Sequence, residues 1–383
     1  METQAKPKPP GDVDVTSFSN AMRLTGRQWL GVGLVALLLP LAPEIWKVYE
    51  PFDPGPDYRM PHELSNDYWL YQRFADLAAD RCDTVLIGDS VNDTILIGDS
   101  VIWGEYATPA ETLSHYLNEQ RGQMGYAIRY ANLGLDGAHP LALEGLVRHY
   151  AGAVRGKNVV LHCNPLWMSS PRRDLQEDRA TEFNHPRLVP QFVPAIPSYP
   201  LSRDKVSERI GIVVEQRSNL SSWTGHLQQA YYDRSDIPEW TLSHPYDNPL
   251  EPLTRGLPPL DFARRHAPQP WFTSGIGKQD YPWVDLETSL QWQAFQRVVA
   301  ILQERGNRVF VLVGPFNEHL LEKASLERYQ KVKATIRSWL EAQGLPYAVP
   351  GALPSEQYGD ASHPLAAGYA ALARQLLKEP AFR

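Results

Sequence analysis

The sequence of 383 residues predicts a three-layer α/β/α fold around a parallel sheet. Apolar strand-like runs alternate with helical segments, which is the pattern of parallel sheets flanked by helices. Two of these runs, at 84–87 and 94–97, each end in Gly-Asp-Ser. An aliphatic run ending in this way is typical of a buried strand that enters a tight loop. Because open α/β sheets bind ligands at the carboxyl ends of their strands, we expect the chemistry there.

Composition excludes some classes of function. The formal charge is −7 and the pI is near 5.9, and no basic run is present. These features argue against a nucleic-acid partner. The two cysteines, Cys82 and Cys163, are too few for a disulfide framework. We expect them at opposite ends of neighbouring strands and therefore unbridged.

The N-terminal region predicts a membrane anchor. Residues 1–27 form a polar tail that we expect to be disordered and cytoplasmic, and 28–43 carry no charge. Trp29 and Trp46 bracket the apolar run, as interfacial residues do. Extending the run to 28–49 gives the ~20 residues that a spanning helix needs.

The flanking charges predict the orientation of this anchor. Arg23 and Arg27 precede the run and Lys47 follows it, which favours an inside N-terminus and places 50–383 in the periplasm or outside the cell. A buried core helix and a cleaved signal peptide are the alternatives. The run has no amphipathic stripe, and 41–43 lacks a good cleavage site. We therefore expect a single-pass anchor in the inner membrane.

The remaining elements follow in order behind a Pro/Asp linker at 51–61. Periodicity and turn residues place each of them. Thr108 is expected to cap one helix, with Pro109 in its first turn. Helices are predicted over 67–80, 108–119, 141–154, 290–305, 325–343 and 366–378, and further strands over 127–133, 158–163, 308–313 and 347–349.

The segment 171–290 differs in character. It contains 15 of the 33 prolines and four of the 11 tryptophans. Only 207–231 has a long periodic pattern. Long connections of this kind are usually functional or disordered, and the aromatic residues argue against disorder. We expect an insertion that serves as a lid or substrate-binding surface, its tryptophans either stacking on sugar or packing inside.

Polar residues at the strand ends fit the needs of acyl transfer. Such a site requires a nucleophilic hydroxyl, a base, a group that orients the base and donors for the oxyanion. The Gly-Asp-Ser serine would lie at a helix N-terminus, where its backbone N–H faces an anion. Gly137 offers a second N–H and Asn164 a side-chain amide. Asp360 and His363 share the loop before the last helix.

Four motifs resemble the blocks of the SGNH/GDSL hydrolase family. Gly-Asp-Ser-Val-Ile-Trp-Gly at 98–104 resembles the first block, and Asn-Leu-Gly-Leu-Asp-Gly at 132–137 resembles the second. His-Cys-Asn-Pro at 162–165 aligns with the third, and Asp-Ala-Ser-His at 360–363 with the last. The resemblance covers about 83–165 and 307–378, and it leaves the insertion out.

The resemblance implies a role for each matched residue. Ser100 would be the nucleophile, His363 the base and Asp360 its partner. Gly137 and Asn164 would complete the oxyanion hole together with the Ser100 amide. No cofactor and no metal are implied, and His162 and Cys163 have no metal-ligand spacing around them.

The sequence departs from the family pattern in two places. In the third block, His162 replaces a glycine and Pro165 an aspartate. The first block occurs twice, so Ser90 is the alternative nucleophile. We prefer Ser100 because Gly104 and a capped helix follow it, whereas use of Ser90 would require ten residues to loop out.

The resemblance implies a serine ester hydrolase or O-acyltransferase that works through an acyl-enzyme. Anchored members of the family look like enzymes that add or remove acetyl groups on envelope polysaccharides, some beside a membrane-bound acyltransferase. The expected partners are therefore the membrane, an acylated glycan or other ester, and a candidate acyltransferase. A lipase or thioesterase is one alternative. The other is a non-catalytic accessory subunit of an envelope polysaccharide machine.

Overall fold

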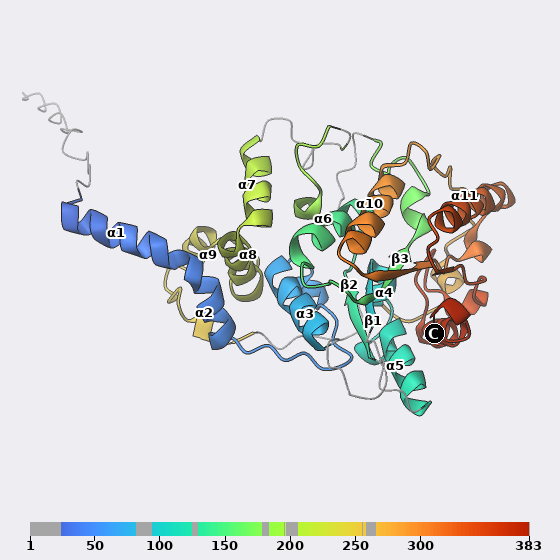
Figure 1. Cartoon of the computed structure of the whole chain (residues 1–383), viewed down its shortest axis with the longest axis horizontal. Coiled ribbons are helices and arrows are strands. Elements are labelled where there is room, and N and C mark those ends of the chain that lie inside the picture. The colour runs from blue at the N-terminus through green and yellow to red at the C-terminus, as the bar shows by residue number, and fades with distance from the viewer. Residues whose placement is uncertain are drawn as a thin grey trace, which may run out of the picture.

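The sheet is parallel throughout and has five strands in the order β2-β1-β3-β4-β5 (Figure 1). The computed structural model describes residues 24–81, 94–124, 129–177, 184–194, 196, 206–254, 256–257 and 266–382. The α/β fold with a parallel sheet is thereby confirmed. The strands are β1 (Thr94–Gly98), β2 (Tyr130–Gly134), β3 (Asn158–Cys163), β4 (Arg308–Val313) and β5 (Tyr347–Ala348).

Successive residues of a strand point to opposite faces of the sheet, and helices pack on both faces. Ile95 and Ile97 belong to one buried cluster, and Leu96 between them belongs to another. The first cluster includes residues of α3 (Tyr68–Arg81), α6 (Pro140–Tyr150), α10 (Leu290–Glu304) and α11 (Lys323–Ala342). The second includes residues of α5 (Leu113–Gln123) and α12 (Ala366–Leu376).

Side-chain caps divide two periodic stretches of the chain. The helix expected over 108–119 begins as a 3-10 turn, Pro109–Glu111, and α5 starts anew after Thr112, whose hydroxyl caps it. The periodic stretch 207–231 is two helices, α7 (Val206–Arg217) and α8 (Asn219–Tyr231). They are separated by Ser218, whose side chain caps α8. In both places a side-chain cap competes with continuation of the helix.

The N-terminal helix projects from the body of the molecule (Figure 1). It runs from Gly26 to Tyr49 as α1 (Gly26–Leu38), a 3-10 turn and α2 (Ala42–Tyr49). At about 1.5 Å per residue this is roughly 36 Å, long and apolar enough to cross a membrane. Almost all of its side chains are exposed, unlike those of a core helix.

A buried polar network joins this helix to the folded domain. The Glu50 carboxylate follows α2 and binds Arg73 of α3 at 2.7 Å and His226 of α8 at 3.0 Å. Its other donors are Trp46 Nε1 and the Tyr231 hydroxyl. We call Trp46, Glu50, Asp67, Arg73, His226 and Tyr231 the anchor joint.

His226 carries the charge that holds the joint together. It is fully buried, with Nδ1 2.6 Å from Asp67 Oδ2 and Nε2 3.0 Å from Glu50 Oε2. Burial by itself would lower the pKa of His226, but the Asp67 carboxylate and then Glu50 raise it to about 9. The folded protein therefore holds a proton that an unfolded histidine, with a pKa of about 6.5, releases.

We expect stability to fall at alkaline pH for this reason. A raised folded-state pKa gives a contribution that is complete below about pH 6.5 and lost as pH rises through about 9. His226→Asn should lower the free energy of unfolding near pH 6.5 by roughly 3 kcal/mol, because it removes the cation that faces the buried Asp67 carboxylate and leaves Arg73 as the cation that binds Glu50. Denaturant unfolding of both proteins between pH 6.5 and 9.5 checks this. An equal pH dependence in the two would contradict it.

The segment between β3 and α10 has two parts. Its helix α8 packs against α3 and α7, and α7, α8 and α9 (Ile237–Ser243) lie on the side from which α1 projects (Figure 1). The later part runs beside the carboxyl end of the sheet, where the backbone N–H of Trp271 donates to the backbone carbonyl of Tyr358. Trp240, Trp271 and Trp283 are buried, so packing, rather than a stacking surface, explains these tryptophans.

Candidate active site

Gly-Asp-Ser at the end of β1 forms a sharp turn into the short helix α4 (Ser100–Trp103). A Cβ on Gly98 would lie 2.5 Å from Ile102 Cγ1 and 2.6 Å from His162 Cβ, so only glycine fits there. Asp99 caps the helix by accepting from Val101 N–H. The strand thus delivers Ser100 to a helix N-terminus at the carboxyl end of the sheet.

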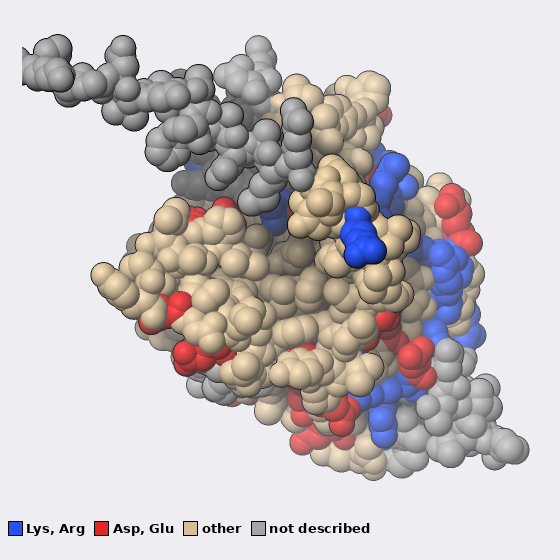
Figure 2. Space-filling model, turned by 90° about the vertical axis from the view of Figure 1, so that its left-hand side faces the viewer, with Lys and Arg blue, Asp and Glu red and all other residues tan. Residues whose placement is uncertain are grey.

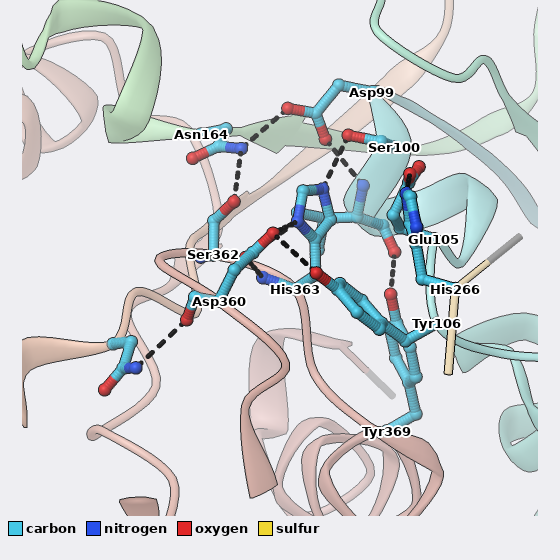
Figure 3. A network of polar contacts seen from close by, with 12 residues as sticks. Asp99, Ser100, Glu105, Tyr106, Asn164, His266, Asp360, Ser362, His363 and Tyr369 are labelled. Atoms are coloured by element: carbon cyan, nitrogen blue, oxygen red, sulfur yellow. Dashed lines mark hydrogen bonds and ion pairs between the residues drawn. The ribbon is translucent and has the colours of Figure 1, made fainter. Parts of the chain in front are cut away.

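Three side chains predicted from two separate motifs come together at this point (Figure 3). Ser100 Oγ lies 2.7 Å from His363 Nε2. His363 Nδ1 lies 2.7 Å from Asp360 Oδ2, and the same carboxylate accepts the backbone N–H groups of Ser362 and His363. The Oγ–imidazole–carboxylate order is that of a serine nucleophile, a general base and the group that orients it.

The alternative nucleophile lies outside the described residues. Ser90 belongs to 82–93, as does Cys82, so the expected separation of the cysteines is not described either. Cys163 is a free, buried thiol at the end of β3. Of the two copies, the described one, with Ser100, is hydrogen-bonded to His363.

The charges in the site favour a protonated base at rest. Burial alone would lower the pKa of His363, but Asp360, and then Glu105 and Asp99, raise it to about 9. Burial opposes ionisation of Asp360 as well, yet His363 and the backbone donors hold the pKa of that carboxyl below its usual range. An imidazolium cannot accept the Ser100 proton, so the reactive form of the site is the minor one near neutral pH.

We expect the reactivity of Ser100 to increase with pH for this reason. A rate that needs neutral His363 should rise by about tenfold per pH unit from pH 7 and level off above about pH 9. Glu105→Gln removes a negative charge that raises the His363 pKa, so it should move the profile to lower pH. Glu119→Gln, on the exposed face of α5, is the matched control. A profile that is flat from pH 7 to 9 would contradict this assignment.

The two expected oxyanion donors follow β2 and β3, the strands on either side of β1. Gly137 lies in the turn after β2 with φ of +70°, and that turn is tied to β1 by Leu135 N–H donating to Gly98 O. Asn164 follows β3. Its amide donates to Asp99 Oδ2 at 2.7 Å and lies 3.5 Å from Ser362 Oγ. One N–H of Asn164 thus serves Asp99, and the second has only the long contact to Ser362.

A buried network supports the first block from behind, and the sequence did not predict it. Asp99 is fully buried, with His162 Nδ1 3.0 Å from Oδ1 and Trp167 Nε1 donating to Oδ2. The other ring nitrogen of His162 faces Gly314 O at 3.0 Å. Burial raises the pKa of Asp99, but His162 and Asn164 lower it to about 2. The unusual histidine of the third block therefore pairs with the aspartate of the first.

We expect His162→Ala to destabilise the fold. The substitution removes the His162 donor and leaves the buried Asp99 carboxylate with Asn164, Trp167 and the Val101 N–H, and removing one partner of a buried pair costs about 3–5 kcal/mol. Adding Asp99→Asn to the His162→Ala variant should recover part of the lost free energy of unfolding, because the asparagine buried at position 99 is neutral. Urea unfolding of the two variants measures this. No recovery in the double variant would show that cavity formation, and not charge, causes the loss.

Three more side chains lie beside the triad (Figure 3). The Tyr106 hydroxyl donates to Asp360 Oδ2 at 3.4 Å, and its ring lies 6.0 Å from that of His363. Glu105 Oε1 is 2.9 Å from Nε2 of His266. His266 belongs to the later part of the 171–290 segment. Sequence motifs did not predict these residues, because the spacing of the residues matches none of them. Among the described residues, no group of three or more His, Cys, Asp or Glu side chains could hold a metal ion.

In comparisons with known proteins, no family model and no curated protein matches the chain. The assignment of a function therefore depends on the geometry of the site and on the four sequence motifs.

Proposed function

We propose that the protein is a serine acyl esterase or O-acyltransferase of the SGNH type, held at a membrane by its N-terminal helix. The observation that carries the proposal is the continuous hydrogen-bonded chain from Ser100 Oγ through His363 to Asp360. The helices on both sides of the sheet are compatible with the three-layer arrangement of that family. In this reading, 171–290 is the insertion.

The proposed reaction begins with attack of Ser100 Oγ on the ester carbonyl. His363 Nε2 accepts the hydroxyl proton while Asp360 holds Nδ1–H in place. The negative charge that develops on the carbonyl oxygen would be met by the backbone N–H groups of Ser100 and Gly137 and by the second amide N–H of Asn164. His363 then returns its proton to the leaving alcohol, and water or a second alcohol attacks the acyl-enzyme. No cofactor is needed for these steps.

We propose an acetyl or other short acyl group on cell-envelope polysaccharide as the substrate, with the domain on the periplasmic or outer side of the inner membrane. The anchor helix and the charges around it support this placement. A membrane-bound acyltransferase is the proposed partner if the enzyme transfers acyl groups. These assignments follow from the resemblance of the motifs to anchored SGNH hydrolases.

A chain-length series tests the substrate class. The full chain in detergent is assayed with p-nitrophenyl acetate, butyrate and octanoate, and by release of acetate from O-acetylated polysaccharide. The proposal expects activity with acetate that falls with chain length, and acetate release that is lost in Ser100→Ala. Preference for octanoate would favour a lipase or thioesterase. Absence of any turnover by folded protein would favour a non-catalytic accessory subunit.

A further inference from the structure

The anchor joint fixes where the bilayer must lie relative to the domain. Glu50, just after α2, binds the buried Arg73 of α3 and His226 of α8, and Trp46 donates to Glu50 and packs its ring against Tyr231 of α8. Closer to the apolar run, Asn219 Nδ2 at the start of α8 donates to Glu44 Oε1 at 3.0 Å. Since 28–43 carry no charge, Glu44 marks the edge of the spanning region. The start of α8 is therefore at the level of the membrane interface.

A small separate core continues from this point. Leu227, Tyr231, Tyr232 and Trp240 form a buried cluster of their own, and Trp46 of the anchor packs against it. The cluster joins α8 and α9 to α2. We call residues 219–254 the collar, because they pack against the anchor where it leaves the apolar run.

The collar exposes large apolar side chains beyond this core. Leu242 is 82% exposed, Tyr246 99% and Leu250 64%. Trp240 of α9 is buried in this core, whereas Leu242 of the same helix is exposed, so α9 has apolar side chains on both of its faces. Three exposed large apolar side chains within nine residues are typical of an interaction surface, not of a surface that faces only water.

The face of the molecule seen along the anchor agrees with this arrangement. Figure 2 looks onto the side from which α1 projects, and the uncharged side chains in its described middle include those of α1 itself. Charged side chains also appear on this face, and within the collar Asp247 and Glu251 are exposed beside Tyr246 and Leu250. A surface that meets the headgroup and acyl boundary has this distribution, with tyrosine and leucine at the interface.

We propose that the collar docks on the lipid bilayer beside the anchor, with Leu242, Tyr246 and Leu250 inserted at the interface. The inference relies on the membrane anchoring proposed above. It assigns a fixed orientation to the domain, because both the anchor joint and the collar would have to release before the domain could turn. The occupant is lipid, since the anchor itself brings the bilayer to this face.

An environment-sensitive label tests the docking. Single cysteines replace Leu34, Tyr246 or Ser338 in a full-length Cys82→Ser background, and each is labelled with the fluorophore NBD. The native Cys163 stays unlabelled because it is buried and burial raises the pKa of its thiol. Ser338 is exposed on α11, at the opposite end of the molecule, and serves as the control (Figure 1). The proteins are placed in nanodiscs with and without brominated lipid.

The expected result is blue-shifted emission at positions 34 and 246 that brominated lipid quenches, with neither change at 338. A label at 246 that stays in water while 34 is quenched would overturn the docking and leave the anchor intact. Unquenched labels at both 34 and 246 would overturn the docking together with the anchoring. Protection of 246 only in native membranes, and not in nanodiscs, would assign the collar to a protein partner and contradict the lipid proposal.

Discussion

Ser100→Ala is expected to lower the hydrolysis of p-nitrophenyl acetate by at least about 10⁴-fold. The substitution removes the only atom of this side chain that contacts the His363 imidazole, the Oγ at 2.7 Å. The loss should appear in kcat, because the hydroxyl forms its bond to the acyl group in the transition state. Steady-state kinetics on protein with an unchanged circular dichroism spectrum makes the measurement.

Ser90→Ala is the matched control for this prediction. Ser90 has the same Gly-Asp-Ser sequence around it as Ser100, and the two differ by ten positions. We expect the Ser90 variant to retain its activity. If the Ser90 variant loses activity and the Ser100 variant keeps it, the nucleophile has been assigned to the wrong copy.

Asp360→Asn is expected to have the second largest effect, a decrease of about 10⁴-fold in kcat. Asp360 Oδ1 accepts two backbone N–H groups, and an asparagine carbonyl can do the same. Its NH₂ group would then face His363 Nδ1 and donate to it. That contact selects the tautomer with the proton on Nε2, which cannot accept the proton of Ser100.

The loop itself should survive this substitution. Its backbone hydrogen bonds and the bond from Asn317 Nδ2 to Asp360 O do not depend on the charge. Unfolding by urea should therefore change little compared with the loss of rate. A rate within about tenfold of the wild type would mean that Asp360 does not hold the catalytic tautomer.

The sequence predicted the parts of the fold that local pattern controls. Strands β3 and β4 were predicted at their observed bounds, because each contains an apolar run, 159–161 or 309–313, with turn residues before and after the strand. The proximity of Ser100 to His363 followed from the rule that parallel strands present their carboxyl ends at one edge. Both side chains belong to loops that leave that edge.

What the sequence did not predict depends on contacts between distant segments. The pairing of His162 with Asp99 follows from the register of β1 and β3, which sets the two loops side by side. Read along the chain, His162 was only a departure from a family block. The anchor joint was missed for the same reason, since Glu50 and His226 are separated by 176 positions.

Labelling of the full-length protein with a fluorophosphonate probe, followed by mass mapping of the modified peptide, tests most directly whether Ser100 is an activated nucleophile. The probe reacts with serine hydroxyls that a neighbouring base activates. We expect one adduct, on Ser100, that forms faster at pH 9 than at pH 7 and is absent in Ser100→Ala. Folded protein that yields no adduct, or an adduct on Ser90, would contradict it.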